Sequence, residues 1–161
     1  SDTYSQLGYQ AESGPWRNFY LTGAQDLLKK AVPYTSKLIN DGVLSQMDMG
    51  TLLDYCAIQL NGEKAGGKEA VININFTDTK EKVMLMLKNG VLNHRLGSQD
   101  KKADLTMEIA KMDFVKLFFG RTDLQTLRKT NKVKTTGDTK AIDMIRSACE
   151  PADPNFNIVL P

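Results

Sequence analysis

Four short strand-like segments, all between residues 70 and 109, constrain the fold of this chain more than any other feature of its sequence. Residues 70–76 place apolar side chains at every second position, which is typical of a strand with one buried face. An apolar run at 83–87 is followed by Asn89-Gly90, a strong hairpin signal, and by a third strand at 91–96. Alternation returns at 105–109. Because the links are short, we expect antiparallel pairing throughout.

Helical periodicity flanks these strands on both sides. The order of elements predicts an α+β fold, an antiparallel five-stranded sheet covered by helices on one face and preceded by a short helical segment. A turn signal at Asn40-Asp41-Gly42 favours a boundary nearby, which divides the chain into residues 1–36 and residues 37–161. The predicted helices lie at 4–11, from Pro15 to before Pro33, and at 49–60, 113–119, 122–130 and 141–149, with the fifth strand at 132–136.

The residue inventory restricts the chemistry of this chain. His94 is the single histidine, so a binuclear zinc site, a zinc finger or a multi-histidine site cannot be assembled. Cys56 and Cys149 fall on apolar helical stripes and are expected to be buried free thiols, with a single disulfide as the alternative. No nucleophile-elbow motif is present, so independent catalysis is not expected. A net charge of +2 argues against nucleic acid as a partner, and no apolar run approaches the 18 residues of a membrane span.

An apolar groove between the sheet and the helices at 113–119 and 122–130 is the candidate ligand site. An aliphatic chain gains about 0.8 kcal/mol per buried methylene, and methionine adapts to flexible ligands. The alternative is that the same side chains form an ordinary core. His94-Arg95 beside Lys101-Lys102 could hold an anionic headgroup, although a solvated charged surface is the simpler interpretation. The predicted groove wall comprises Met84, Met86, Leu105, Met107, Ile109, Phe114, Leu117, Phe118, Leu124 and Leu127.

A second candidate site is an aromatic stripe on the helix that begins at Pro15. The stripe consists of Trp16, Phe19, Tyr20 and Leu27. Two short helices cannot bury side chains of this size between themselves, so the stripe favours a subunit or domain interface over an intramolecular core. We therefore expect a homodimer that forms through residues 4–32.

Two stretches of the chain resemble bacterial alkyl sulfatases of the SDS-hydrolase type. Residues 7–13 (LGYQAES) and 16–27 (WRNFYLTGAQDL) are similar to the end of the helical dimerisation domain of these enzymes. The second stretch begins at Met47 and is similar to their C-terminal domain, which has the sterol-carrier-protein fold. Its matching motifs are Leu52-Leu53-Asp54-Tyr55, Asn75-Phe76-Thr77-Asp78-Thr79 with Glu81, Lys88-Asn89-Gly90-Val91-Leu92, Asp113-Phe114 with Gly120, and Phe156-Asn157-Ile158-Val159.

The resemblance implies that this chain is part of a larger enzyme. The family carries a metallo-β-lactamase-type domain that hydrolyses alkyl sulfate esters with two zinc ions, and its His-x-His-x-Asp-His motif is absent from this sequence. No catalytic residue can be transferred, no cofactor is expected in this chain, and zinc is expected only in the catalytic domain. Since the chain also lacks an initiating Met, we expect a processed or trimmed piece, and the sequence leaves its compartment undefined. The expected partners are a long-chain alkyl sulfate or fatty acid and the catalytic domain, while a structural dimerisation module and a free-standing lipid carrier remain the alternatives.

Overall fold

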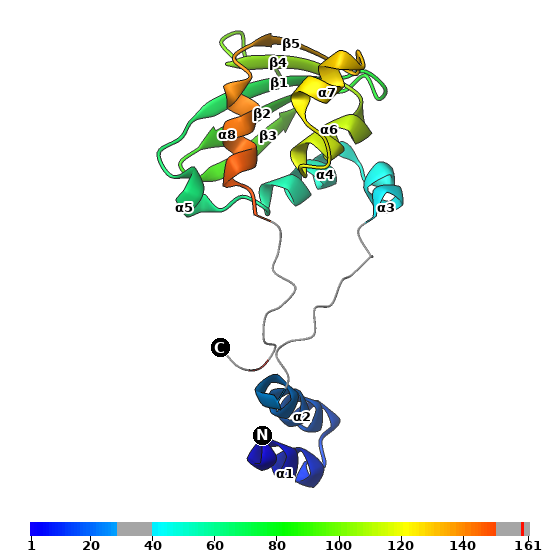
Figure 1. Cartoon of the computed structure of the whole chain (residues 1–161), viewed down its shortest axis with the longest axis vertical. Coiled ribbons are helices and arrows are strands. Elements are labelled where there is room, and N and C mark those ends of the chain that lie inside the picture. The colour runs from blue at the N-terminus through cyan, green and yellow to red at the C-terminus, as the bar shows by residue number, and fades with distance from the viewer. Residues whose placement is uncertain (29–39, 151–158, 160–161) are drawn as a thin grey trace. The chain divides into compact units, whose positions relative to one another are not determined.

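A five-stranded β-sheet organises the larger part of the chain (Figure 1). The computed structural model describes residues 1–28, 40–150 and 159. The chain divides into two compact units, one formed by Ser1–Lys37 with Ala152–Pro161 and the other by Leu38–Pro151. The prediction that a domain boundary follows residue 36 falls on residues outside the described ones.

The first unit contains α1 (Asp2–Gln10) and α2 (Gly14–Leu28). The two helices approach closely at Gly8, where a Cβ atom would lie 2.7 Å from side-chain carbons of Leu21. The backbone N–H of Val159 donates a hydrogen bond to the Asp26 carboxylate at 3.1 Å, so Val159 contacts α2. The helix predicted to end before Pro33 is described as far as Leu28, and its remainder lies outside the described residues.

The sheet has the strand order β3-β2-β1-β4-β5. The strands are β1 (Ala70–Phe76), β2 (Lys82–Lys88), β3 (Val91–Leu96), β4 (Leu105–Ile109) and β5 (Val133–Gly137). Asn89 and Gly90 both have positive φ, 52° and 73°, as a type I′ turn between β2 and β3 requires. The predicted α+β class and the five strands are therefore confirmed.

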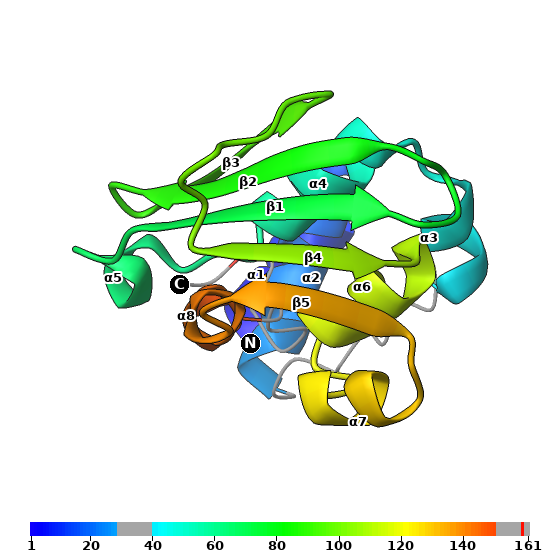
Figure 2. The same ribbon diagram turned by 90° about the horizontal axis from the view of Figure 1, so that it is seen from above.

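The prediction that all strands pair antiparallel is wrong, because β1 and β4 are parallel, with Ile72 opposite Leu105. The segment 97–104 connects β3 to β4 by crossing the sheet face that the helices leave open (Figure 2). The Asn73 side chain holds this segment, donating to the Asp100 carbonyl at 2.7 Å and accepting from the Asp100 N–H at 3.0 Å. Three strand spacings, about 14 Å, separate β3 from β4 in the sheet. The eight residues of segment 97–104 can span roughly 27 Å when extended. A parallel crossover therefore needs no helix here.

Helices cover the other face of the sheet (Figures 1 and 2). The core lies between them and the side chains of Ile72, Ile74 and Phe76, all buried. Two helices lie in segments for which no helix was predicted, namely α3 and the four-residue α5. The helices of this unit are α3 (Asp41–Gln46), α4 (Met49–Ala57), α5 (Gly62–Ala65), α6 (Lys111–Phe118), α7 (Leu124–Lys129) and α8 (Lys140–Ala148).

Candidate functional site

The predicted groove residues do not line one groove. Leu105, Met107 and Ile109 of β4 pair with the residues of β1 that face the helices. Met84 and Met86 instead pair with Asn73 and Val71, so they lie on the opposite face of the sheet. Placing these two methionines in the groove was therefore wrong, since a continuous apolar run does not reveal which residues point inward.

The remaining predicted groove residues pack into the core. All eight are buried, which matches the alternative of an ordinary core at these positions. Phe118 differs from the other seven because it also lines a pocket. These eight residues are Leu105, Met107, Ile109, Phe114, Leu117, Phe118, Leu124 and Leu127.

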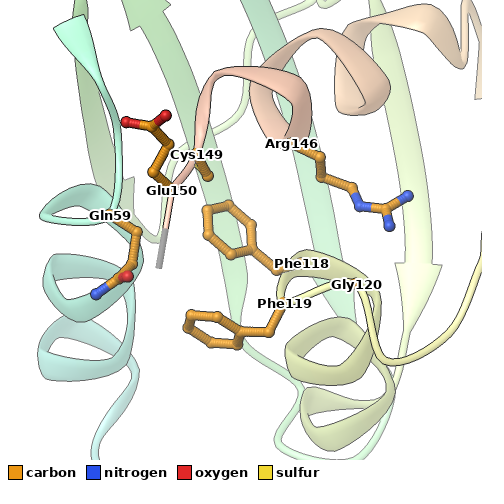
Figure 3. Close-up of a pocket in the computed structure, with 7 residues that line it drawn as sticks. All are labelled: Gln59, Phe118, Phe119, Gly120, Arg146, Cys149 and Glu150. Carbon is orange, nitrogen blue, oxygen red and sulfur yellow. The ribbon is translucent and has the colours of Figure 1, made fainter. Parts of the chain in front are cut away.

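A pocket of about 240 Å³ opens beside the C-terminal ends of α6 and α8 (Figure 3). In Figure 3 the Phe118 and Phe119 rings lie in the middle, Gln59 and Glu150 lie at one end, and Arg146 lies at the other. The volume is slightly below the range of about 300–1,000 Å³ of sites that enclose a whole drug-sized ligand. It therefore suits part of a long ligand. Its lining residues are Gln59, Phe118, Phe119, Gly120, Arg146, Cys149 and Glu150.

The aromatic floor of this pocket continues into the core. The Phe118 ring centroid lies 5.4 Å from that of Phe119 and 5.9 Å from that of Phe114. The Phe119 ring in turn lies 5.5 Å from that of Tyr55 on α4. These separations are within the range of favourable aromatic pairs. The rings are thus held by neighbours on both sides and form a fixed apolar surface.

Backbone hydrogen bonds fix the two walls. At the end of α6 the Gly120 N–H donates to the Leu117 carbonyl and the Arg121 N–H to the Lys116 carbonyl, with Gly120 at φ 69°. This Schellman termination turns the chain away directly after Phe119. On the other side, the Glu150 N–H donates to the Gln59 carbonyl at 2.8 Å. The backbone after α4 is thereby joined to the end of α8.

The two charged residues of the pocket, Glu150 and Arg146, differ in their hydrogen-bond partners. The Glu150 carboxylate accepts hydrogen bonds from Lys64 Nζ and Asn61 Nδ2, which hold the pKa of Glu150 below its usual value. Arg146 lies on α8 with a side chain that is 22% exposed, and its Nη1 lies 3.6 Å from the Asp143 carboxylate. Its Nε is buried, and no atom of the described residues accepts a hydrogen bond from it.

Both cysteines are free thiols, Cys56 buried and Cys149 half-buried. Burial raises the pKa of Cys149 to about 11, and burial together with the Cys149 charge raises that of Cys56 to about 12. At neutral pH both thiols are therefore protonated, so Cys149 presents the pocket with a weakly polar surface and no nucleophile. This arrangement can bind an amphiphile through apolar contact and charge.

A larger hollow of about 410 Å³ lies beside β2 and β3, and Met86 is one of its lining residues. Glu69, Lys88 and Arg95 also line it and are exposed. Since strongly solvated charges border it, an aliphatic chain would gain less there than against the aromatic rings of the smaller pocket. We therefore regard the pocket at Phe118 as the candidate site.

The remaining sequence candidates can also be placed. His94 Nδ1 lies 3.7 Å from the Asp54 carboxylate. Within residues 1–28, 40–150 and 159, no three His, Cys, Asp or Glu side chains are grouped to hold a metal ion. The helices of the same residues include none that is long and apolar enough to cross a membrane.

The aromatic stripe of α2 lies on the surface of the first unit. Trp16 is 58% exposed, and Phe19 and Leu27 are about as exposed. The Trp16 ring stacks on Tyr20 at 5.7 Å and meets the edge of Phe19 at 6.3 Å. The stripe is therefore an exposed aromatic cluster, which the helices of this unit do not bury.

Sequence reasoning missed most of the pocket. Arg146 is charged, so the apolar stripe of α8 did not include it. Gln59 and Glu150 lie in segments far apart in the sequence, which are brought together by the β-bridge between Leu60 and Cys149. The signal that could have found the pocket is Phe119-Gly120, a large apolar residue directly before a helix-ending glycine.

The sequence matches two family models. The model described as alkyl sulfatase C-terminal covers residues 37–161, and the one described as alkyl sulfatase dimerisation covers residues 1–30. A linear primary-alkylsulfatase from a Pseudomonas species is 38% identical over the whole chain, which covers 24% of that protein. The alkyl/aryl-sulfatase BDS1 of Saccharomyces cerevisiae is 29% identical, again over the whole chain and 25% of the relative.

Solved structures give the same assignment. The inverting sec-alkylsulfatase Pisa1 from a Pseudomonas species superposes with a TM-score of 0.81 and 35% identity, over 98% of this chain and 25% of that protein. A sterol carrier protein 2 from Yarrowia lipolytica reaches a TM-score of 0.40 at 22% identity over 76% of this chain and 98% of that protein, a similarity too low to decide the fold. The chain spans about a quarter of the length of the curated relatives that it matches. It belongs to the alkyl sulfatase C-terminal family, and its first 30 residues match the dimerisation segment of the same enzymes.

Proposed function

We propose that this chain is the non-catalytic C-terminal portion of an alkyl sulfatase-like hydrolase and that it binds the aliphatic chain of alkyl sulfates or similar lipids. Its relatives are named for alkyl sulfatase activity, and the C-terminal family model covers residues 37–161. Ester hydrolysis then belongs to a zinc-containing, metallo-β-lactamase-type domain outside these residues. The expected sterol-carrier-like architecture of the C-terminal domain is part of the same proposal.

The pocket at Phe118 and Phe119 is the observation that carries this proposal. It replaces the groove predicted from the sequence, whose residues are core or lie on the other face of the sheet. Two aromatic rings form its floor, and the half-buried Cys149 thiol adds apolar surface. Each methylene that the pocket removes from water contributes about 0.8 kcal/mol. Burial of four or five methylenes therefore gives roughly 3–4 kcal/mol, enough to hold a substrate chain reversibly.

Isothermal titration with dodecyl sulfate below its micelle concentration tests the proposal. Gln59→Trp places a large side chain at one end of the pocket, and Gln125→Trp makes the same change at an exposed position on α7. We expect Gln59→Trp to weaken binding at least fivefold and Gln125→Trp to leave it unchanged. The proposal fails if the heats equal those of an unrelated globular domain, or if both variants bind as the parent chain does.

A second function, subunit assembly, is favoured by the exposed aromatic cluster of α2. We propose that residues 1–30 form a homodimer through this cluster, as the match to the dimerisation model supports. Surface aromatic residues are enriched at protein interfaces. This function is compatible with ligand binding because the cluster and the pocket belong to different units.

A further inference from the structure

Arg146 has a hydrogen-bond donor that the described residues do not use. Its Nε is buried without an acceptor among them, while Nη1 lies 3.6 Å from the Asp143 carboxylate. A buried donor left unpaired costs the folded chain the free energy of the hydrogen bond that it made with water. An oxygen atom that bonds to Nε when the partly exposed Arg146 side chain turns towards the pocket would remove that cost. An anionic oxygen would gain most because guanidinium bonds to oxyanions are charge-assisted.

The position of Arg146 within the pocket is asymmetric. Figure 3 shows its guanidinium at the Gly120 end, with the Phe118 and Phe119 rings between it and Glu150. A Cβ at Gly120 would lie 3.9 Å from Nη2, so the turn after α6 comes close to the guanidinium without placing a side chain beside it. The carboxylate of Glu150 lies at the far end, where Lys64 and Asn61 bind it.

This asymmetry matches an anionic amphiphile. We infer that Arg146 is the specificity-determining residue of the pocket and binds the sulfate or carboxylate headgroup of the ligand, while the first methylenes of the chain lie on the two phenylalanine rings. The inference rests on the proposed function, to which it adds the headgroup and its orientation. The reverse orientation would bring the anion towards the Glu150 carboxylate and leave Arg146 Nε unpaired.

Asp143 competes with the ligand for the same guanidinium. Its carboxylate is the acid paired with Arg146, and its side chain is 63% exposed. An arriving anion must share or replace this contact. Removal of the Asp143 charge therefore favours the ligand, whereas a purely structural role of Arg146 would make the Asp143 variant neutral or harmful for binding.

The test compares two ligands with the same alkyl chain, octyl sulfate and the uncharged octyl glucoside, both below their micelle concentrations, on the full chain. We expect the parent chain to bind octyl sulfate about ten- to a hundredfold more tightly than octyl glucoside, the range of one charge-assisted contact. Arg146→Gln should bring the two affinities within threefold by weakening octyl sulfate alone. Arg146→Lys should retain part of the preference, and Asp143→Asn should increase it.

Arg128→Gln is the matched control, since it removes an exposed arginine from α7 that does not line the pocket and changes net charge equally. It should leave both affinities unchanged. The Arg146 Nε–H resonance provides a direct readout, and it should shift with octyl sulfate but not with inorganic sulfate at the same concentration. Equal affinities of the parent chain for the two detergents, or unchanged octyl sulfate binding by Arg146→Gln, overturn this inference alone. If neither detergent binds, both this inference and the proposed function are overturned.

Discussion

The ammonium group of Lys111 donates a hydrogen bond to the carbonyl oxygen of Ser45 at 3.0 Å and also contacts the Met47 carbonyl oxygen. Lys111 is the first residue of α6, and these carbonyls lie at the C-terminal end of α3. The Lys111 backbone N–H donates in turn to the Asp78 carboxylate, at 3.0 Å to Oδ2. One buried lysine therefore joins the β1–β2 turn, α3 and α6.

Lys111→Met should destabilise the larger unit by about 1–3 kcal/mol, because it leaves buried carbonyl oxygens without a donor. A urea unfolding curve measures this loss. Lys116→Met on the same helix is the matched control, and its effect should stay within about 0.5 kcal/mol. Equal stabilities of the two variants would show that the Lys111 contacts contribute nothing.

Gly137→Ala should be more destabilising than the same change at Gly97. Both glycines have positive φ, 104° and 69°, so each substitution strains the backbone by about 1–2 kcal/mol. A Cβ at Gly137 would also lie 2.3 Å from the Asp104 carbonyl oxygen, while a Cβ at Gly97 would have no heavy atom of the described residues within 4 Å apart from its chain neighbours. This clash at the β4–β5 pairing should add roughly 1–3 kcal/mol. Thermal unfolding of the two variants side by side gives the comparison, and a smaller loss for Gly137→Ala would contradict it.

Cys149 should react slowly with alkylating reagents at neutral pH. With its pKa raised to about 11, about one thiol in a thousand is ionised at pH 8, and the rate should rise about tenfold per pH unit until the pH approaches 11. Octyl sulfate should slow this alkylation further because Cys149 lines the proposed site. Peptide mass mapping after iodoacetamide treatment reports the rate, with the fully buried Cys56 as the internal reference. Rapid labelling at pH 7, unaffected by ligand, would be inconsistent with both expectations.

Phe19→Lys should convert a dimer of this chain to a monomer. The substitution places a charge in the middle of the exposed aromatic cluster, where desolvation of the ammonium on assembly opposes association. Light scattering at several concentrations measures the change in mass. Val91→Lys, at an equally exposed apolar position in the other unit, should leave the mass unchanged. A parent chain that is monomeric at high concentration would remove the basis for this prediction.

Local patterns in the sequence predicted the elements well. The alternation at 70–76, the Asn89-Gly90 turn and the glycine that ends α6 all have the predicted structure, because each depends on residues close together in the chain. The start of α6 was predicted at Asp113 but lies at Lys111, since the Asp78 carboxylate from the β1–β2 turn accepts the hydrogen bond of its first N–H. Similarly, the helix predicted from residue 122 begins at Leu124, because the Asp123 side chain caps it.

Features that depend on distant segments escaped prediction. The parallel pairing of β1 with β4 depends on how segment 97–104 crosses the sheet, and hydrophobicity does not encode that path. The face on which Met84 lies is equally hidden within the apolar run of β2. In the candidate pocket a backbone hydrogen bond joins Gln59 to Glu150, and such a bond carries no side-chain signal.

The crossing segment 97–104 also has a consequence for the order in which the sheet forms. β1, β2 and β3 are joined by short turns and can pair by local collapse, whereas β4 reaches β1 after the chain has passed over the hairpin that precedes it. Closing this loop costs conformational entropy, and the two hydrogen bonds between Asn73 and Asp100 offset part of that free-energy cost. The three-stranded meander should therefore be the folding nucleus, and Asn73 the residue at which its growth towards β4 and β5 begins.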